Sequence, residues 1–176
     1  MNNVAIPKSV LFVASVNSCH ISIEEAVREN DISSLMRILM RENISMLKLL
    51  ALQAGDVNQD TCEITIKNIA ALKKNNFYIK PMRNFQKILF SKDSVKLLIS
   101  EIQKNLFSGK VNNFIFADRN GEFYRPSYYV EKFRELSERV GFAVTPKNLN
   151  AIYKSFLFSR NIDDYFAAYM EALRCS

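Results

Sequence analysis

The chain has 176 residues, of which 48% are hydrophobic and 24% are charged. This length suits one domain or at most two small ones, and the apolar fraction is enough for a packed core. With four glycines and four prolines, the composition excludes collagen-like repeats and argues against disorder and most all-β folds.

The formal net charge is +6. A basic surplus of this size favours anionic partners such as nucleic acid or acidic membrane surfaces. Because the chain also carries 18 acidic residues, the alternative that the basic residues are ordinary solvated surface charges stays open.

The histidine and cysteine content gives no metal site. Cys19, Cys62 and Cys175 are far apart, and His20 is the single histidine, whereas a structural zinc site needs about four ligands at short spacing. Phosphate-binding and dinucleotide-binding motifs are also absent, so we expect no cofactor. The odd cysteine count suits a reducing compartment, and the apolar run from Val10 to Val16 is too short to span a bilayer. These features predict a cytoplasmic protein without a membrane segment.

Capping signals begin three helices in the first third of the chain. Ser22 and Glu25 have the spacing of a capping box. Asp31 is predicted to cap a second helix, and Asn43 or Ser45 a third. The second helix has apolar residues at helical spacing, which are Ile32, Leu35, Met36, Leu39 and Met40.

Two strands are predicted in the middle of the chain. Glu63 to Lys67 alternates apolar and polar residues, and Phe77 to Lys80 ends just before Pro81. The polar segment from Leu72 to Asn76 separates them, so the pair is predicted to form a β-hairpin.

The second half is predicted to be mostly helical. The expected elements are a helix from Ser94 to Phe107, a strand from Phe114 to Phe116, and helices from Tyr128 to Val140, Lys147 to Phe158 and Asp163 to Leu173. Residues expected in the core are Val130, Phe133, Leu136 and Val140, the stripe Leu149, Ile152, Tyr153 and Phe156 of the next helix, and Phe85, Phe90, Phe107, Phe114 and Phe116. The predicted class is mainly α (α+β), a helical domain with a small antiparallel hairpin or sheet.

Two stretches carry a resemblance to a known family. Residues from Ile44 to Val57 are similar to its segment around the first catalytic arginine, and residues from Phe114 to Ile162 include Thr145-Pro146 before a helix. In this order and spacing they resemble the catalytic domain of tyrosine recombinases, or phage integrases. The resemblance covers residues 21–176, with 1–20 as an N-terminal extension, so 1–176 is expected to be a single integrase-like domain.

The resemblance implies DNA-cleavage chemistry whose side chains are largely missing. In the family a tyrosine attacks a DNA phosphodiester, and two arginines with a histidine or lysine stabilise the phosphate charge, because the guanidinium fork donates two parallel hydrogen bonds. The arginine positions hold Ser45 and Asn150, the hairpin lysine falls at Lys73, the histidine-or-lysine position holds Lys147, and the later histidine falls near Cys175. The position of the nucleophilic tyrosine lies beyond the last residue. We therefore expect a degenerate recombinase without cleavage activity, and not an enzyme.

The expected role is a DNA-binding regulator or accessory factor. Duplex DNA is the expected partner, and the residues expected to contact it form two basic groups. The first surrounds the hairpin and consists of Lys73, Lys74, Lys80 and Arg83, and the second surrounds the carboxyl-terminal half and consists of Arg119, Arg125, Lys147, Lys154 and Arg160. Two alternatives stay open. The first is an adaptor or effector that binds a protein partner, or forms a homo-oligomer, without DNA. The second is a fragment of an active site-specific recombinase.

Overall fold

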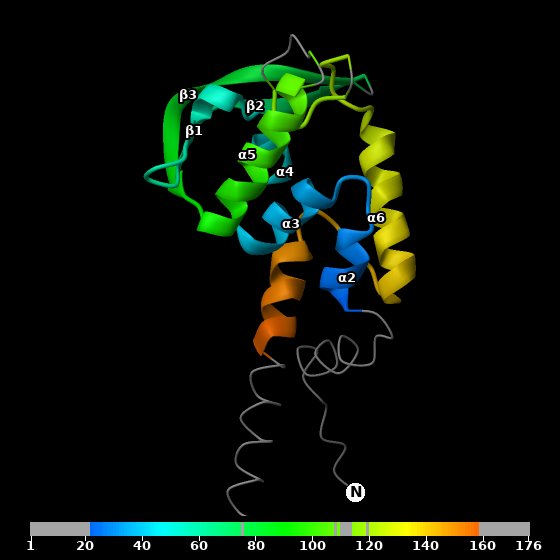
Figure 1. Cartoon of the computed structure of the whole chain (residues 1–176). Coiled ribbons are helices and arrows are strands. Elements are labelled where there is room, and N and C mark those ends of the chain that lie inside the picture. Colours follow the sequence, from blue (N-terminus) through cyan, green and yellow to red (C-terminus); the bar gives the residue numbers. More distant parts are fainter. Residues whose placement is uncertain (1–21, 75, 108, 110–113, 119, 159–176) are drawn as a thin grey trace, which may run out of the picture.

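A computed structural model describes residues 22–74, 76–107, 109, 114–118 and 120–158. In it, a curved sheet arches over one end of a group of helices (Figure 1). The elements are α2 (Ile23–Arg28), α3 (Ser33–Arg41), α4 (Met46–Leu50), a 3₁₀ turn (Ala54–Asp56), β1 (Val57–Asn58), β2 (Glu63–Lys73), β3 (Asn76–Leu89), α5 (Lys92–Phe107) and α6 (Pro126–Val140), with residues 149–158 also helical. The predicted class, mainly α (α+β) with a small antiparallel sheet, is confirmed.

Two of the predicted helix caps are present. The Ser22 hydroxyl accepts a hydrogen bond of 3.2 Å from the backbone N–H of Glu25, and the Ser45 hydroxyl accepts one of 3.4 Å from that of Lys48. Each bond satisfies one of the N–H groups that a helix leaves open in its first turn.

The predicted cap of α3 by Asp31 is wrong. Ile32 occupies the cap position without a side-chain hydrogen bond, and the Asn30 side chain accepts instead from the Ile32 N–H at 3.2 Å. The carboxylate of Asp31 lies 2.8 Å from the ammonium of Lys132 on α6. The side chain that was predicted to cap the helix therefore forms an ion pair with a distant residue instead.

The sheet is antiparallel in the order β1-β2-β3, and its strands run further than predicted. Ile64, Ile66 and Ala70 of β2 are buried against the helices. β3 continues past Pro81, which pairs with Asn68. Since β3 is an edge strand of the described sheet, a proline without an N–H group is tolerated there.

An irregularity bends β3 in its middle. Ile66 pairs with Gln86 while Asn68 pairs with Pro81, so residues 82–85 lie opposite Lys67 alone. Such bulges bend and twist a strand, and the curvature of β3 is visible in Figure 1. Phe85 lies in the bulge and is 66% exposed, so its predicted place in the core is wrong.

Residues 114–116 do not form a strand. Phe114 makes one isolated bridge with Gln53, and the Ile115 N–H donates to the Leu52 carbonyl at 3.0 Å. The segment after α5 is thus attached to the end of the α4 region by a single bridge. Phe107, at the end of α5, is 92% exposed and is not a core residue either.

The inward face of α6 is predicted correctly except at its first position. Phe133, Leu136 and Val140 are buried as predicted, whereas Val130 is 69% exposed and Tyr129 is buried in its place. The helix begins at Pro126, whose fixed φ suits a first turn, and ends at Gly141 in the left-handed conformation with φ 78°.

The last described helix begins two residues later than predicted, at residue 149. Thr145 and Asn148 close the turn before it, because the Asn148 side chain accepts from the Thr145 N–H at 2.6 Å and the Thr145 hydroxyl accepts from the Asn148 N–H at 3.3 Å. Leu149, Ile152 and Tyr153 are buried as predicted. The predicted extension over residues 1–20 and the helix from Asp163 to Leu173 lie outside the described residues.

Candidate nucleic-acid interface

The structure brings Asn150 beside the loop that leads to Ser45. The side-chain amide of Asn150 donates to the carbonyl of Met40 at 2.7 Å and to that of Glu42 at 3.5 Å, at the carboxyl end of α3. Ser45 follows three residues later as the cap of α4. Both side chains are therefore occupied in holding backbone groups.

The same loop is attached to the beginning of α5. The carboxylate of Glu42 accepts hydrogen bonds from the N–H and the hydroxyl of Ser91, at 3.0 and 2.6 Å. The ammonium of Lys48 lies 2.6 Å from the side-chain oxygen of Gln86 on β3. The ends of α3, α4, β3 and α5 thus meet in one polar region, which we call the α3–α4 junction.

Lys147 lies near this region, in the exposed turn before the last described helix. It makes no ion pair with any described residue, so its ammonium is directed to solvent. Cys175, Arg119 and Arg160 lie outside the described residues, and the structure gives them no place.

The hairpin end of β2 and β3 carries three residues of the first predicted basic group, while the fourth, Arg83, lies in the bulge of β3 opposite Lys67. Lys73 pairs with Asn76 across the turn, and Lys74 has a positive φ of 47°, which is an uncommon conformation that tight hairpin turns require. Lys80 lies opposite Ile69 on the outer face. Lys73, Lys74, Lys80 and Arg83 are all exposed and make no ion pair within the described part of the chain.

The hairpin end is separated from the α3–α4 junction. Lys48 of the junction contacts β3 at Gln86, which pairs with Ile66. The strand from Ile66 to Lys73 spans roughly 23 Å at about 3.3 Å per residue. The structure therefore does not gather Lys73 with Ser45 and Asn150.

The second predicted basic group is divided between the two regions. Arg125 immediately precedes the first turn of α6. The hairpin turn lies over this same end of the helix (Figure 1), where the rings of Phe77 and Tyr129 are 5.9 Å apart. Lys147 and Lys154 lie beyond the opposite end of α6, which is about 22 Å long at 1.5 Å per residue. Arg125 belongs with the hairpin end, and the two lysines with the junction.

Comparison with known proteins gives structural but no sequence matches. No protein-family model matches the chain, and no curated protein matches it in sequence. The Tn1549 transposon integrase in complex with transposon right end DNA is similar with a TM-score of 0.57 and 15% identity, over 84% of this chain and 50% of that chain. The XerA recombinase is similar with a TM-score of 0.52 and 19% identity, over 87% of this chain and 49% of that chain.

The chain has the fold of the tyrosine recombinase catalytic domain. The resemblance seen in the sequence is thereby confirmed at the level of fold. The chain spans about half the length of these solved recombinases, and identities this low show the shared fold alone.

Within this recombinase fold, sequence reasoning missed a group of arginines beside the junction. Arg28 of α2 and Arg37 and Arg41 of α3 line a small hollow of about 20 Å³ together with Glu24. Arg41 lies 3.9 Å from Asp93. The spacing of Arg37 and Arg41, four residues apart on a predicted helix, places them on one face and was a usable signal.

Glu24 is the acidic member of this group, and it is shared with Tyr153. The Tyr153 hydroxyl donates to the Glu24 carboxylate at 2.8 Å. Burial, followed by this hydrogen bond and the negative charge of Glu24, raises the pKa of Tyr153. Tyr153 stays neutral at physiological pH, and the hollow keeps a surplus of positive charge suited to phosphate oxygens.

Among the described residues of this recombinase fold, no group of three or more histidine, cysteine, aspartate or glutamate side chains is arranged to hold a metal ion. Nor does any helix in the described ranges have the length and apolar character needed to cross a membrane.

Proposed function

We propose that this protein binds duplex DNA and does not cleave it, acting as a regulator or accessory factor. The observation that carries the proposal is that the side chains of Ser45 and Asn150 bind backbone groups of the protein itself. Both stand where the resemblance expects phosphate-binding arginines, and both are engaged in backbone hydrogen bonds. A hydroxyl and an amide cannot supply the bidentate, charged donation that stabilises a phosphoryl transition state.

DNA binding is supported by the distribution of unpaired cations. Lys73, Lys74, Lys80 and Arg125 are exposed around the hairpin end, and Arg83 is exposed in the bulge of β3, all without ion-pair partners among the described residues. Exposed cations gathered in this way suit the phosphate backbone, which is contacted without regard to base sequence. The structural similarity to an integrase in complex with DNA is consistent with this use of the fold.

The binding test is fluorescence anisotropy with random duplex DNA at several salt concentrations. Lys73→Ala/Lys74→Ala should weaken binding and lower the slope of log K against log salt by up to about 1.8, since each phosphate contact contributes roughly 0.9. The matched control is Lys92→Ala/Lys96→Ala, which removes two exposed charges from α5 and should leave the slope unchanged. Absence of binding at low salt would contradict the proposal.

Cleavage is tested separately by incubating the protein with supercoiled plasmid. Strand cleavage and religation would relax the plasmid, and nicking would open it. We expect neither product. Relaxation by the purified chain would refute the non-catalytic role while leaving DNA binding intact.

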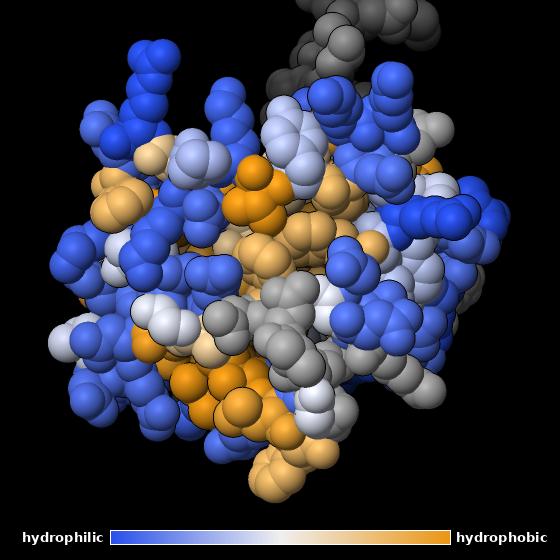
Figure 2. Space-filling model, turned by 90° about the horizontal axis from the view of Figure 1, so that it is seen from above, coloured by the Kyte–Doolittle hydropathy of each residue, from blue (hydrophilic) through white to orange (hydrophobic). Residues whose placement is uncertain are grey.

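Exposed apolar side chains favour an adaptor as the second candidate. Phe85 and Leu89 of β3 and Phe107 of α5 are 66%, 72% and 92% exposed. Figure 2 shows apolar side chains in the middle of one face, surrounded by polar ones. Since exposed apolar patches mark protein contacts, failure to bind DNA together with self-association, abolished by Phe85→Ser/Leu89→Ser, would favour this function.

The remaining alternative concerns a longer protein. The chain spans about half the length of the solved recombinases, so the activity of a fragment of a site-specific recombinase is also a proposal. We place the protein in the cytoplasm because an odd number of cysteines, three in all, suits a reducing compartment.

A further inference from the structure

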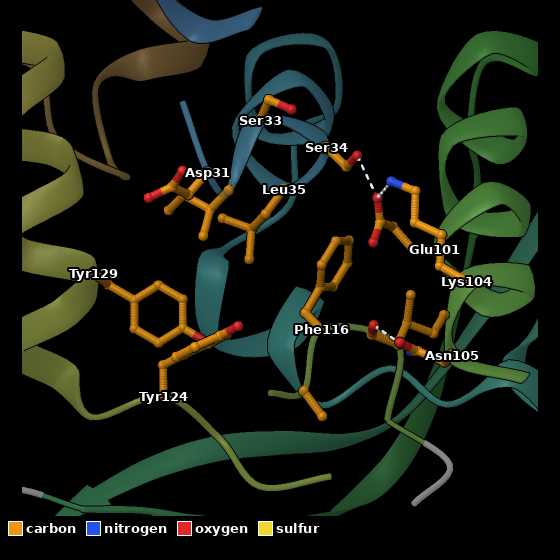
Figure 3. A pocket seen from close by; sticks show the side chains of 13 residues that line it. Asp31, Ser33, Ser34, Leu35, Glu101, Lys104, Asn105, Phe116, Tyr124 and Tyr129 are labelled. Atoms are coloured by element: carbon orange, nitrogen blue, oxygen red, sulfur yellow. Dashed lines mark hydrogen bonds and ion pairs between the residues drawn. The ribbon is translucent and has the colours of Figure 1, made fainter. Parts of the chain in front are cut away.

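A pocket of about 470 Å³ opens between the first turn of α3, the last turns of α5 and the segment that precedes α6 (Figure 3). None of the residues assigned above to DNA contact lines it. Its volume lies in the range of small-molecule sites, so it calls for an explanation separate from DNA binding.

One wall of the pocket contains a buried hydroxyl group without a partner. Tyr129 is 2% exposed, and its hydroxyl makes no hydrogen bond with any residue that the structure describes. Burial raises the pKa of Tyr129, so the hydroxyl keeps its proton and can donate it. Buried hydroxyl groups in proteins nearly always have a partner, so this one has a hydrogen-bond donor left to offer.

Tyr124 covers this hydroxyl. Its ring lies 6.1 Å from that of Tyr129 at an angle of 85°, and Figure 3 shows both side chains entering from the same wall. The Tyr129 oxygen has no exposed surface in this conformation. The ring of Tyr124 is also stacked on that of Tyr128, with centroids 4.4 Å apart, so a ligand reaches the hydroxyl only if Tyr124 turns away from Tyr129, and this movement is part of the binding proposed below.

The opposite wall presents a fixed carboxylate. One oxygen of Glu101 accepts from the Ser34 hydroxyl and from the Lys104 ammonium, each at 2.7 Å. These bonds hold the group in place, as Figure 3 shows. A carboxylate is an acceptor only, so it selects for a ligand with N–H or O–H donors.

The charge and shape of the lining narrow the ligand further. Asp31 and Glu101 are each paired with a lysine, Asp31 with Lys132 at 2.8 Å and Glu101 with Lys104 at 2.7 Å, so neither carboxylate is an unpaired charge that would call for a cationic ligand. Leu35, Phe116 and the ring of Tyr124 supply apolar surface. Flat aromatic surfaces suit a planar ring.

We propose that this pocket binds an uncharged, planar nitrogen heterocycle of nucleobase size. A ring nitrogen or carbonyl of the ligand accepts from the Tyr129 hydroxyl. Its N–H groups donate to Glu101, and one face lies against Phe116.

The test is isothermal titration of the full chain with adenine, which has both acceptors and N–H donors. Tyr129→Phe keeps the ring and should weaken adenine binding at least tenfold, and Glu101→Gln should weaken it by a similar factor. The matched control, Tyr128→Phe, changes the neighbouring tyrosine, which does not line the pocket, and should leave the affinity unchanged.

Two results would overturn the proposal. The first is no heat of binding with adenine at millimolar concentration in the wild-type chain. The second is binding that survives both Tyr129→Phe and Glu101→Gln. Using two substitutions on opposite walls keeps the test decisive if one variant fails to fold. Since no DNA-contact residue is changed, anisotropy with duplex DNA serves as the check that each variant is native.

Discussion

The side-chain amide of Asn150 donates a 2.7 Å hydrogen bond to the backbone carbonyl of Met40, joining the last described helix to the end of α3. The last carbonyls of a helix have no partner within it. Asn150 therefore fills a structural need at a position where the resemblance expects an arginine that contacts DNA phosphate.

Asn150→Ala should lower the free energy of unfolding by about 1–2 kcal/mol, because it leaves a carbonyl at the end of α3 without its donor. Urea denaturation measures the change. Lys154→Ala is the control, since it alters an exposed residue of the same helix, and it should stay within about 0.5 kcal/mol. Equal stability of the two variants would mean that water replaces the amide at no cost.

Ser45→Ala should cost about 1 kcal/mol, because the first turn of α4 loses its side-chain cap. Ser45→Asp should keep most of the stability, since aspartate caps equally well and its charge suits a helix N-terminus. Thermal denaturation of both variants separates capping from any other role. A larger loss for Asp than for Ala would show that the cap is not the reason for the effect.

Asp56 and Lys67 form the ion pair with the most deeply buried carboxylate. Their charged atoms lie 2.7 Å apart, with side-chain exposures of 1% and 41%. Lys67→Met should lower stability by about 2–3 kcal/mol, because a buried carboxylate is left without its cation. This loss of stability is smaller than that expected for a fully buried ion pair, because Lys67 is partly exposed to solvent.

The double variant Lys67→Met/Asp56→Asn tests whether the loss comes from the unpaired carboxylate, since it removes both charges. The amide oxygen of the new asparagine can still accept the hydrogen bond from the Gln53 N–H that the Asp56 carboxylate accepts at 3.0 Å. The double variant should recover part of the loss, and a double-mutant cycle in urea measures the coupling. Additive losses would mean that the two residues act independently.

Stability should fall at alkaline pH. The pKa of Tyr129 is raised above its ordinary value of 10.0 by burial, and the pKa of Tyr153 is raised as well. The folded state holds these protons more tightly than the unfolded state, so their contribution is complete below pH 10 and is lost as the pH rises beyond it.

Urea midpoints between pH 8 and 11 measure this dependence. Tyr129→Phe should show a smaller decline than wild type, because phenylalanine has no proton to lose. At pH 8 it should be as stable as wild type or more stable, since it removes a buried hydroxyl without a partner. An unchanged alkaline decline would show that folding does not raise the pKa of Tyr129.

The features that were predicted correctly depend on residues close together in the sequence. The caps at Ser22 and Ser45 and the buried stripe of the last described helix are each determined by residues three or four positions apart. Features set by distant residues were not predictable in this way. The role of Asp31 depends on Lys132, which lies about a hundred residues later, and the length of β3 depends on the partner that β2 offers.

The candidate site was predicted in identity but not in arrangement. The motif spacing gave Ser45, Asn150 and the basic residues, yet Arg125 and Lys147 were expected together and lie at opposite ends of α6. Arg125 and Lys147 flank α6, and the length of this 15-residue helix keeps them apart in space. The arginines of α2 and α3 are gathered by packing of two helices, which no single stretch reveals.

The ring of Phe77 packs against Phe123 and Tyr129, at 6.3 and 5.9 Å between centroids. This anchorage prevents the hairpin from swinging as an independent arm, so the distance between its lysines and Arg125 is built into the fold. A duplex that meets all of these charges must adjust its own groove width and curvature to them. Preference among DNA sequences would then follow from how readily each one deforms, without any side chain reading a base.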